Sequence, residues 1–66
     1  MKNNIKIERA RNNFTQGDLA ERVGVSRQTI NSIETKKYIP SAVLALKIAK
    51  IFDMKVDELF ELEDDD

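Results

Sequence analysis

Residues 19–34 read LAERVGVSRQTINSIE, and the order of apolar and polar side chains in this stretch determines the fold. An apolar stripe at helical spacing begins at Leu19 and Val23, stops at Gly24, and resumes at Ile30 and Ile33. A glycine one residue past a helix commonly adopts the left-handed conformation that ends the helix. The stretch therefore predicts two helices joined by a tight turn, not one continuous helix.

Residues that favour helix N-termini precede both halves of this stretch. Thr15 and Asp18 have the spacing of a capping box, which predicts a helix over 16–23. Ser26 is a favoured N-cap residue and predicts a second helix that runs to about Thr35. The two predicted helices begin where side chains can satisfy their free amides.

The unit 16–35 also has what two steeply crossing helices require. Ala20 is small enough for the backbones to approach, Gly24 permits the tight turn, and Val25 supplies an apolar residue after it. This pattern is typical of a helix-turn-helix motif.

The rest of the chain shows helical spacing and no hairpin signal. Further helices are predicted over 4–12, 42–52 and 56–60, with Ser41 as the cap of the second and Pro40 ending the loop before it. The segment 4–12 carries only a thin apolar pattern of Ile5, Ile7 and Ala10. The apolar side chains expected to point inward from the other two segments are Leu44, Ala45, Ile48, Ala49, Phe52, Val56, Leu59 and Phe60. The sequence predicts an all-α bundle of five short helices.

Composition excludes several classes of function. The chain has 66 residues, no cysteine and no histidine, so the sequence predicts one small domain without disulfides, thiolate chemistry or the usual zinc sites. It offers no nucleophile paired with a base and no phosphate-binding loop, so we expect no enzyme, no catalytic residue, no metal and no cofactor. No run is long enough to cross a bilayer, and residues 1–13 lack the apolar segment of a signal peptide. We expect a cytoplasmic protein with no membrane contact and no ligand domain.

Charge is distributed unevenly along the chain. The net charge is −1, but residues 61–66, ELEDDD, carry five of the twelve acidic side chains. Residues 1–60 carry eleven basic and seven acidic side chains, a net charge of +4. We therefore divide the chain into a domain over 1–60 and an acidic tail over 61–66. The tail is either a solvated end or a device that repels DNA from the non-binding side.

One family carries these features together. The segment FTQGDLAERVGVSRQTINSIE at 14–34, followed by Pro40 and by LKIA at 46–49, resembles the Cro/C1-type (XRE) helix-turn-helix regulators. Among them the chain is most similar to small single-domain repressors of the cytolysin-repressor kind, from about Ile5 to Phe60. The resemblance implies a lambda-repressor-like fold and a repressor that binds an inverted-repeat operator in double-stranded DNA as a homodimer. Some small members add a two-stranded sheet, which here would pair MKN with part of FELEDD.

The resemblance also assigns roles to individual residues. It implies that the helix over about 26–35 enters the major groove and reads bases with Arg27, Gln28, Asn31 and Ser32. The side chains implied to meet phosphates or backbone are Gln16, Ser26, Thr29, Lys36, Lys37 and Tyr38. It further implies a buried structural ion pair between Arg9 and Glu34. The chemistry is suitable, because arginine bonds bidentately to guanine, asparagine and glutamine bond to adenine, and helix N-termini bind phosphate.

Two questions remain open from the sequence. A homodimer needs an apolar interface, and the surplus apolar residues near the C-terminal end suggest Met54, Val56, Leu59 and Leu62 as candidates, with Val43 and Ile51 also available. An antitoxin-like interaction module that regulates its own promoter is the alternative function, although little sequence follows the last helix to block a toxin.

The chain departs from the family at Glu8, where leucine is usual, and at Gly17, where a helix former is common.

Overall fold

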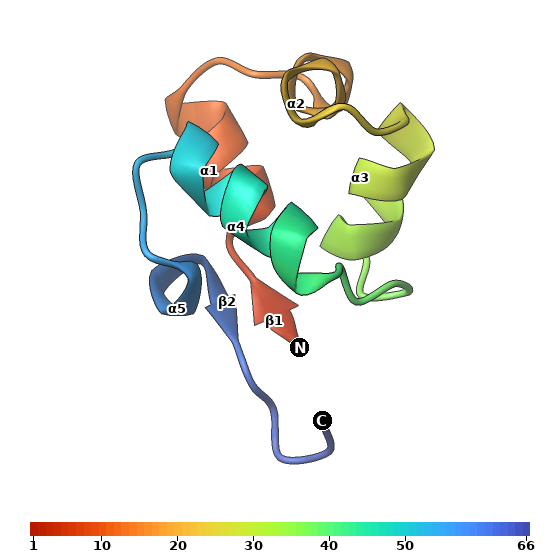
Figure 1. The fold of residues 1–66 in the computed structure, drawn as a ribbon, viewed down its shortest axis with the longest axis vertical. Helices are drawn as coiled ribbons and strands as arrows, with labels where there is room; N and C mark the ends of the chain where they lie inside the picture. The colour runs from red at the N-terminus through yellow and green to blue at the C-terminus, as the bar shows by residue number, and fades with distance from the viewer.

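The computed structural model describes all 66 residues as five short helices and a two-stranded sheet (Figure 1). The elements in chain order are β1 (Lys2–Asn3), α1 (Ile5–Arg11), α2 (Gln16–Val23), α3 (Arg27–Glu34), α4 (Ala42–Ile51), α5 (Val56–Leu59) and β2 (Phe60–Glu61). The predicted five-helix class is confirmed, and each helix lies within about one residue of its expected bounds. None of the helices has the length and apolar character that crossing a membrane requires.

The two chain ends form the sheet that the resemblance implied. β1 and β2 pair antiparallel, with Lys2 opposite Glu61 and Asn3 opposite Phe60. The ladder continues into a backbone bond from Asn4 N to Leu59 O of 3.0 Å. Phe60 was expected to end the last helix, and this expectation is wrong, because its φ of −117° and ψ of 143° are those of a strand. The fold thus extends one residue into the segment 61–66.

Side-chain caps begin three of the helices, as predicted. Thr15 Oγ1 accepts from Asp18 N, and Thr15 N donates to the Asp18 carboxylate, so the capping box is complete. The Thr15 hydrogen bonds lower the pKa of Asp18. Ser26 Oγ accepts from Thr29 N at the start of α3, and Ser41 Oγ accepts from Leu44 N at the start of α4. These bonds satisfy amides that have no partner inside the helix.

The first four helices all end with the same backbone conformation. A residue with positive φ follows each helix, and the next amide bonds back to the carbonyl five residues earlier, as in a Schellman motif. The four left-handed residues are Asn13, Gly24, Lys36 and Asp53. Asparagine and aspartate tolerate this conformation better than most residues, whereas Lys36 adopts it at a steric cost.

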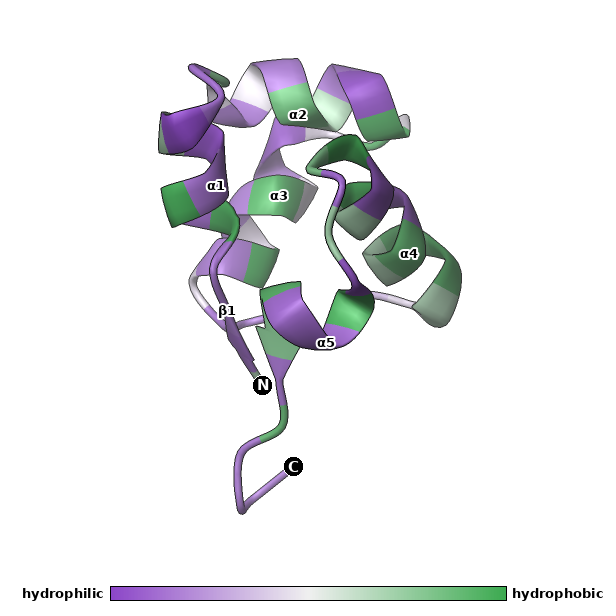
Figure 2. Cartoon of the chain, turned by 90° about the vertical axis from the view of Figure 1, so that its left-hand side faces the viewer, coloured by the Kyte–Doolittle hydropathy of each residue, from purple (hydrophilic) through white to green (hydrophobic).

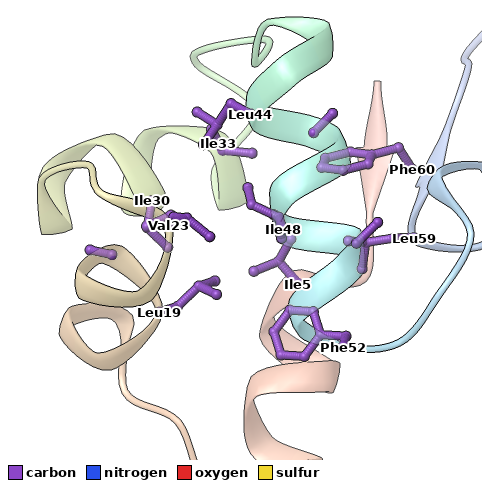
Figure 3. Packing of buried hydrophobic residues seen from close by; sticks show 13 residues of the cluster. Ile5, Leu19, Val23, Ile30, Ile33, Leu44, Ile48, Phe52, Leu59 and Phe60 are labelled. Carbon is purple, nitrogen blue, oxygen red and sulfur yellow. The ribbon is translucent and has the colours of Figure 1, made fainter.

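A single core holds the helices together. Figure 3 shows Leu19, Val23 and Ile30 from the α2–α3 pair directed toward Ile48 of α4 and Ile5 of α1. Thirteen residues form this core: Ile5, Leu19, Ala20, Val23, Ile30, Ile33, Leu44, Ala45, Ile48, Ala49, Phe52, Leu59 and Phe60. The predicted inward stripe of α4 is confirmed.

Helix α1 contributes one buried residue to the core. Of the three apolar residues in its thin pattern, Ile5, Ile7 and Ala10, only Ile5 is buried. Residues two apart point to different sides of a helix, so Ile5 and Ile7 cannot both face the core. Phe14, just after α1, packs partly buried against Phe52 at a ring-centroid distance of 6.1 Å, and the Arg22 guanidinium lies 4.3 Å from the Phe14 ring centroid.

Candidate nucleic-acid interface

Helices α2 and α3 form one unit through the turn at Gly24. Gly24 has a φ of 76°, and Val25 N donates to Ala20 O at 3.0 Å across the turn. Ala20 is buried where the helices approach, and Val25 packs partly buried against the core. α2 also packs against α4, which fixes the pair on the bundle (Figure 1). The turn thus orients α3 with one side on the core and the other outward.

The outer side of α3 carries the predicted base-reading residues. Ile30 and Ile33 are buried, whereas Arg27, Gln28 and Asn31 are exposed. Ser32 is half-buried at the edge of this face. Two shallow depressions in the surface bring the predicted residues together, one lined by Gln16, Arg27, Gln28 and Asn31 and the other by Ser26, Gln28, Thr29, Ser32 and Tyr38. The polar side chains therefore form one continuous face that starts on α2 and extends past α3.

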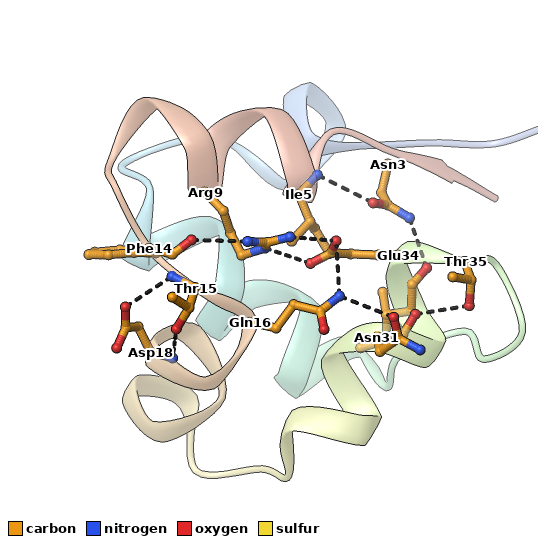
Figure 4. Close-up of polar contacts among 11 residues, drawn as sticks. Asn3, Ile5, Arg9, Phe14, Thr15, Gln16, Asp18, Asn31, Glu34 and Thr35 are labelled. Carbon is orange, nitrogen blue, oxygen red and sulfur yellow. Dashed lines mark hydrogen bonds and ion pairs between the residues drawn. The ribbon is translucent and has the colours of Figure 1, made fainter.

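Gln16 bridges the two helices of the unit. Its Nε2 donates to Asn31 Oδ1 at 3.1 Å and lies 3.4 Å from Glu34 Oε1 (Figure 4). Asn31 Oδ1 accepts this hydrogen bond, whereas Asn31 Nδ2 has no partner in the structure and keeps its two donors free. Gln16 was predicted to contact phosphate; in the structure it orients a neighbouring side chain of the same face.

Arg9 and Glu34 form a bidentate ion pair between α1 and the last turn of α3. Arg9 Nε donates to Glu34 Oε2 at 2.7 Å, and Arg9 Nη2 donates to Glu34 Oε1 at 2.9 Å. Arg9 Nη1 donates to Phe14 O at 3.0 Å. The two side chains are 14% and 7% exposed, and the hydrogen bond to Glu34 raises the pKa of Arg9. Figure 4 shows that a continuous series of hydrogen bonds connects Phe14, Arg9, Glu34, Gln16 and Asn31.

The N-termini of α2 and α3 offer amides to an anion. Thr15 and Ser26 satisfy the third amide of their helices, and Ser26 Oγ also shares a 2.9 Å hydrogen bond with Thr29 Oγ1. The first amides of each helix have no intrahelical partner, and the helix dipole favours negative charge there. Both helix starts can therefore bind phosphate oxygens.

The basic segment after α3 divides into free and paired side chains. Lys37 and Tyr38 are exposed, and their amides bond to Ser32 O. Lys36 was predicted to contact phosphate, but its Nζ lies 2.9 Å from Glu63 Oε1. Neither this ion pair nor the bond from Asn3 Nδ2 to Ile33 O at the end of α3 was identified from the sequence. No periodicity in the sequence relates these distant segments.

The apolar candidates for an interface need correction. Leu59 is only 1% exposed because α5 turns it into the core, so it cannot contact a second copy. Met54 and Val56 are partly buried against the core, and Leu62 is exposed. Residues at the start of α4 are more accessible: Ile39, Val43 and Leu46 are 61%, 64% and 60% exposed. Figure 2 shows α4 as largely hydrophobic.

Known proteins resemble the chain over nearly its whole length. The family model described as Helix-turn-helix matches residues 5–59. An uncharacterized HTH-type transcriptional regulator of Methanocaldococcus jannaschii is 56% identical over 66 residues and the full length of both chains. An uncharacterized HTH-type transcriptional regulator of Bacillus subtilis is 51% identical over 98% of each chain. The N-terminal DNA-binding domain of SinR from Bacillus subtilis matches with a TM-score of 0.78 and 28% identity, covering 91% of this chain and 88% of that one.

Proposed function

The chain belongs to the Cro/C1-type (XRE) helix-turn-helix family of transcriptional regulators, not to an enzyme family, and we propose that it is a repressor that binds an inverted-repeat operator as a homodimer. Residues 1–60 form the proposed DNA-binding domain, with 16–35 as the reading unit. The observation that carries the proposal is the polar outer face of α3, opposite the buried Ile30 and Ile33. The proposed repressor covers promoter DNA and excludes polymerase from it.

In the proposed complex α3 lies in the major groove. Arg27 at its first turn is exposed and has donors suited to guanine O6 and N7. Asn31, one turn later, has its amide nitrogen available for an adenine, with its orientation fixed by Gln16. Gln28 and Ser32 contribute further hydrogen bonds at the same face.

Phosphate contacts flank the proposed base contacts. We assign these contacts to the free amides at the starts of α2 and α3 and to the exposed side chains of Lys37 and Tyr38, which follow α3. Such contacts position the protein on the duplex, whereas base contacts supply the sequence preference.

A second copy is proposed to cover the exposed apolar side chains around the start of α4. Ile39, Val43 and Leu46 lie within eight residues of sequence, and each is at least 60% exposed, so a second copy would remove three large apolar side chains from water. This patch follows the loop that leaves α3, and in the proposed dimer a two-fold axis through it holds the two copies of α3 on one side. Helix-turn-helix dimers hold their recognition helices about 34 Å apart, one turn of DNA.

Selection from a pool of random DNA duplexes tests the proposal. We expect enrichment of an inverted repeat whose half-sites lie about 10 base pairs apart, and a complex whose mass corresponds to two chains per duplex. Placing the enriched sequence over a reporter promoter should lower transcription when the protein is present. Enrichment of no sequence would contradict specific binding, and enrichment with increased transcription would contradict repression.

A further inference from the structure

We propose that the acidic segment 61–66 competes intramolecularly with DNA for Lys36 and holds this side chain off the phosphate backbone. The inference rests on the proposed function, because it concerns a residue beside the proposed DNA-reading helix. Its starting point is the ion pair between Lys36 Nζ and Glu63 Oε1 at 2.9 Å. The segment thereby limits the electrostatic attraction for DNA and increases the relative weight of base contacts.

The position of Lys36 explains why this pair matters. Lys36 is the second residue after α3 and has a φ of 65°, a left-handed conformation that turns the chain away from the helix axis. Its side chain is 49% exposed, so it is accessible to a phosphate once released. The adjacent Lys37 is exposed and has no ion pair in the structure. Of two consecutive lysines beside the proposed interface, one is already neutralised.

The segment that supplies Glu63 is folded, not extended into solvent. Glu63 N donates to Asp66 Oδ2 at 2.8 Å, and Asp66 N donates to Glu63 O at 3.0 Å, which closes a turn. Glu63 Oε1 also lies 3.2 Å from the Met1 ammonium, and Asp66 Oδ1 lies 2.9 Å from the same group. These contacts and strand β2 fix the carboxylate beside Lys36.

The charges of Lys36 and Glu63 favour competition between the Glu63 carboxylate and a DNA phosphate for Lys36. The hydrogen bond from Lys36 lowers the pKa of Glu63, and the hydrogen bond to Glu63 raises the pKa of Lys36, so both groups are charged at neutral pH. A lysine that contacts a phosphate releases a condensed counterion from DNA and steepens the salt dependence of binding. A lysine held by a carboxylate does not, unless the carboxylate is displaced first.

The test measures binding of a labelled mixed-sequence duplex across a range of salt concentrations. We expect Glu63→Gln to bind about threefold more tightly, the effect of removing one exposed competing ion pair. The slope of log K against log[salt] should steepen by about 0.9, the value for one added phosphate contact. Asp64→Asn is the matched control, because it removes the same charge from the same segment and Asp64 makes no ion pair in the structure.

A cycle with Lys36 identifies the mechanism. Lys36→Gln alone should change affinity little, and in the double variant it should abolish the gain caused by Glu63→Gln. Equal gains from Glu63→Gln and Asp64→Asn, unaffected by Lys36→Gln, would overturn the inference in favour of general repulsion by the segment. Unchanged affinity in Glu63→Gln would overturn it as well. If the folded wild-type chain and all variants fail to bind even at low salt, the proposed function itself fails; thermal melts establish that each variant is folded.

Discussion

Arg27 is the residue on which the proposed sequence preference most depends. It lies at the first turn of α3, is exposed, and forms no ion pair in the structure. Arg27→Ala should relax the preference at one base position by about 1–3 kcal/mol, because the bidentate hydrogen bonds to guanine are removed. Competition binding with single-base variants of the selected operator measures this effect.

Lys37→Ala is the control for Arg27→Ala. Lys37 is exposed in the loop that follows α3, where the proposal assigns it a phosphate contact. Its removal should weaken binding about equally on all sequences and reduce the salt slope by about 1. A uniform loss from Arg27→Ala would instead show that Arg27 contacts only the DNA backbone.

We expect Arg9 to contribute to the stability of the fold and not to DNA recognition. Arg9→Met leaves the Glu34 carboxylate, which is 7% exposed, without its bidentate partner. The free energy of unfolding should fall by up to about 3–5 kcal/mol, the cost of breaking a fully buried pair, because this pair is partly buried. Chemical denaturation followed by circular dichroism provides the measurement.

The control for Arg9→Met is on the same helix. Arg11 pairs with Glu8 on the surface, with its side chain 71% exposed, so Arg11→Met should change stability by about 1 kcal/mol or less. Replacing both Arg9 and Glu34 with methionine should recover much of the stability, because no partly buried charge is left unpaired. Similar losses of stability from Arg9→Met and Arg11→Met would contradict the assigned structural role.

At the scale of an element, substitution by alanine should have opposite effects on stability at the two glycines. Gly24→Ala should destabilise by about 1–2 kcal/mol, because the φ of 76° strains any residue with a Cβ although the space around it is open. Gly17→Ala should stabilise by up to about 1 kcal/mol, because position 17 is helical and the new Cβ would meet only Thr15 Oγ1 at 3.7 Å. Thermal melts of the two variants compare them directly. A change in melting temperature in the same direction for both would contradict the assigned conformations.

Helix ends could be predicted where a side chain participates in the backbone pattern. Thr15, Ser26 and Ser41 were identifiable as caps because their residue types and spacing match the free amides that they bind. Phe60 was misassigned because a four-residue helix followed by a two-residue strand contains too few residues for periodicity to distinguish them. The positive φ of Lys36 had no signal in the sequence, because its residue type does not favour that conformation.

At the scale of the whole molecule, the exposed apolar patch predicts a mutation that separates dimerisation from folding. Leu46→Glu places a charge in the proposed interface and should yield a folded monomer. Its operator affinity should fall by about 10²-fold or more, because two half-sites are no longer bound together. Sedimentation equilibrium gives the mass of the variant.

Ile7→Glu is the matched control for Leu46→Glu, since Ile7 is a similarly exposed apolar residue but lies on α1. This variant should keep the mass and affinity of the wild type. A monomeric wild-type chain, or a dimer that survives Leu46→Glu, would contradict the proposed interface.

The faces of single helices could be predicted from the sequence, but contacts between elements could not. Helical spacing was sufficient to place Ile30 and Ile33 inward and Arg27 and Asn31 outward, because one helix determines which side of it each residue occupies. The sequence placed Leu59 both among the inward residues and among the interface candidates, because the choice between them depends on how α5 sits against α4. Contacts between distant segments, such as Lys36 with Glu63, require the assembled fold.

The pairing of the chain ends also determines how the molecule would respond to force. In the antiparallel ladder Lys2 faces Glu61, and both chain ends leave the sheet on that side. Tension applied to the two ends would therefore break the backbone bonds one after another, as in a zipper, and not all at once in shear. The bond from Asn3 Nδ2 to Ile33 O would break early in this process, while the core is still intact. A pull on the chain ends would thus loosen the end of α3 at a lower force than the one that unfolds the domain.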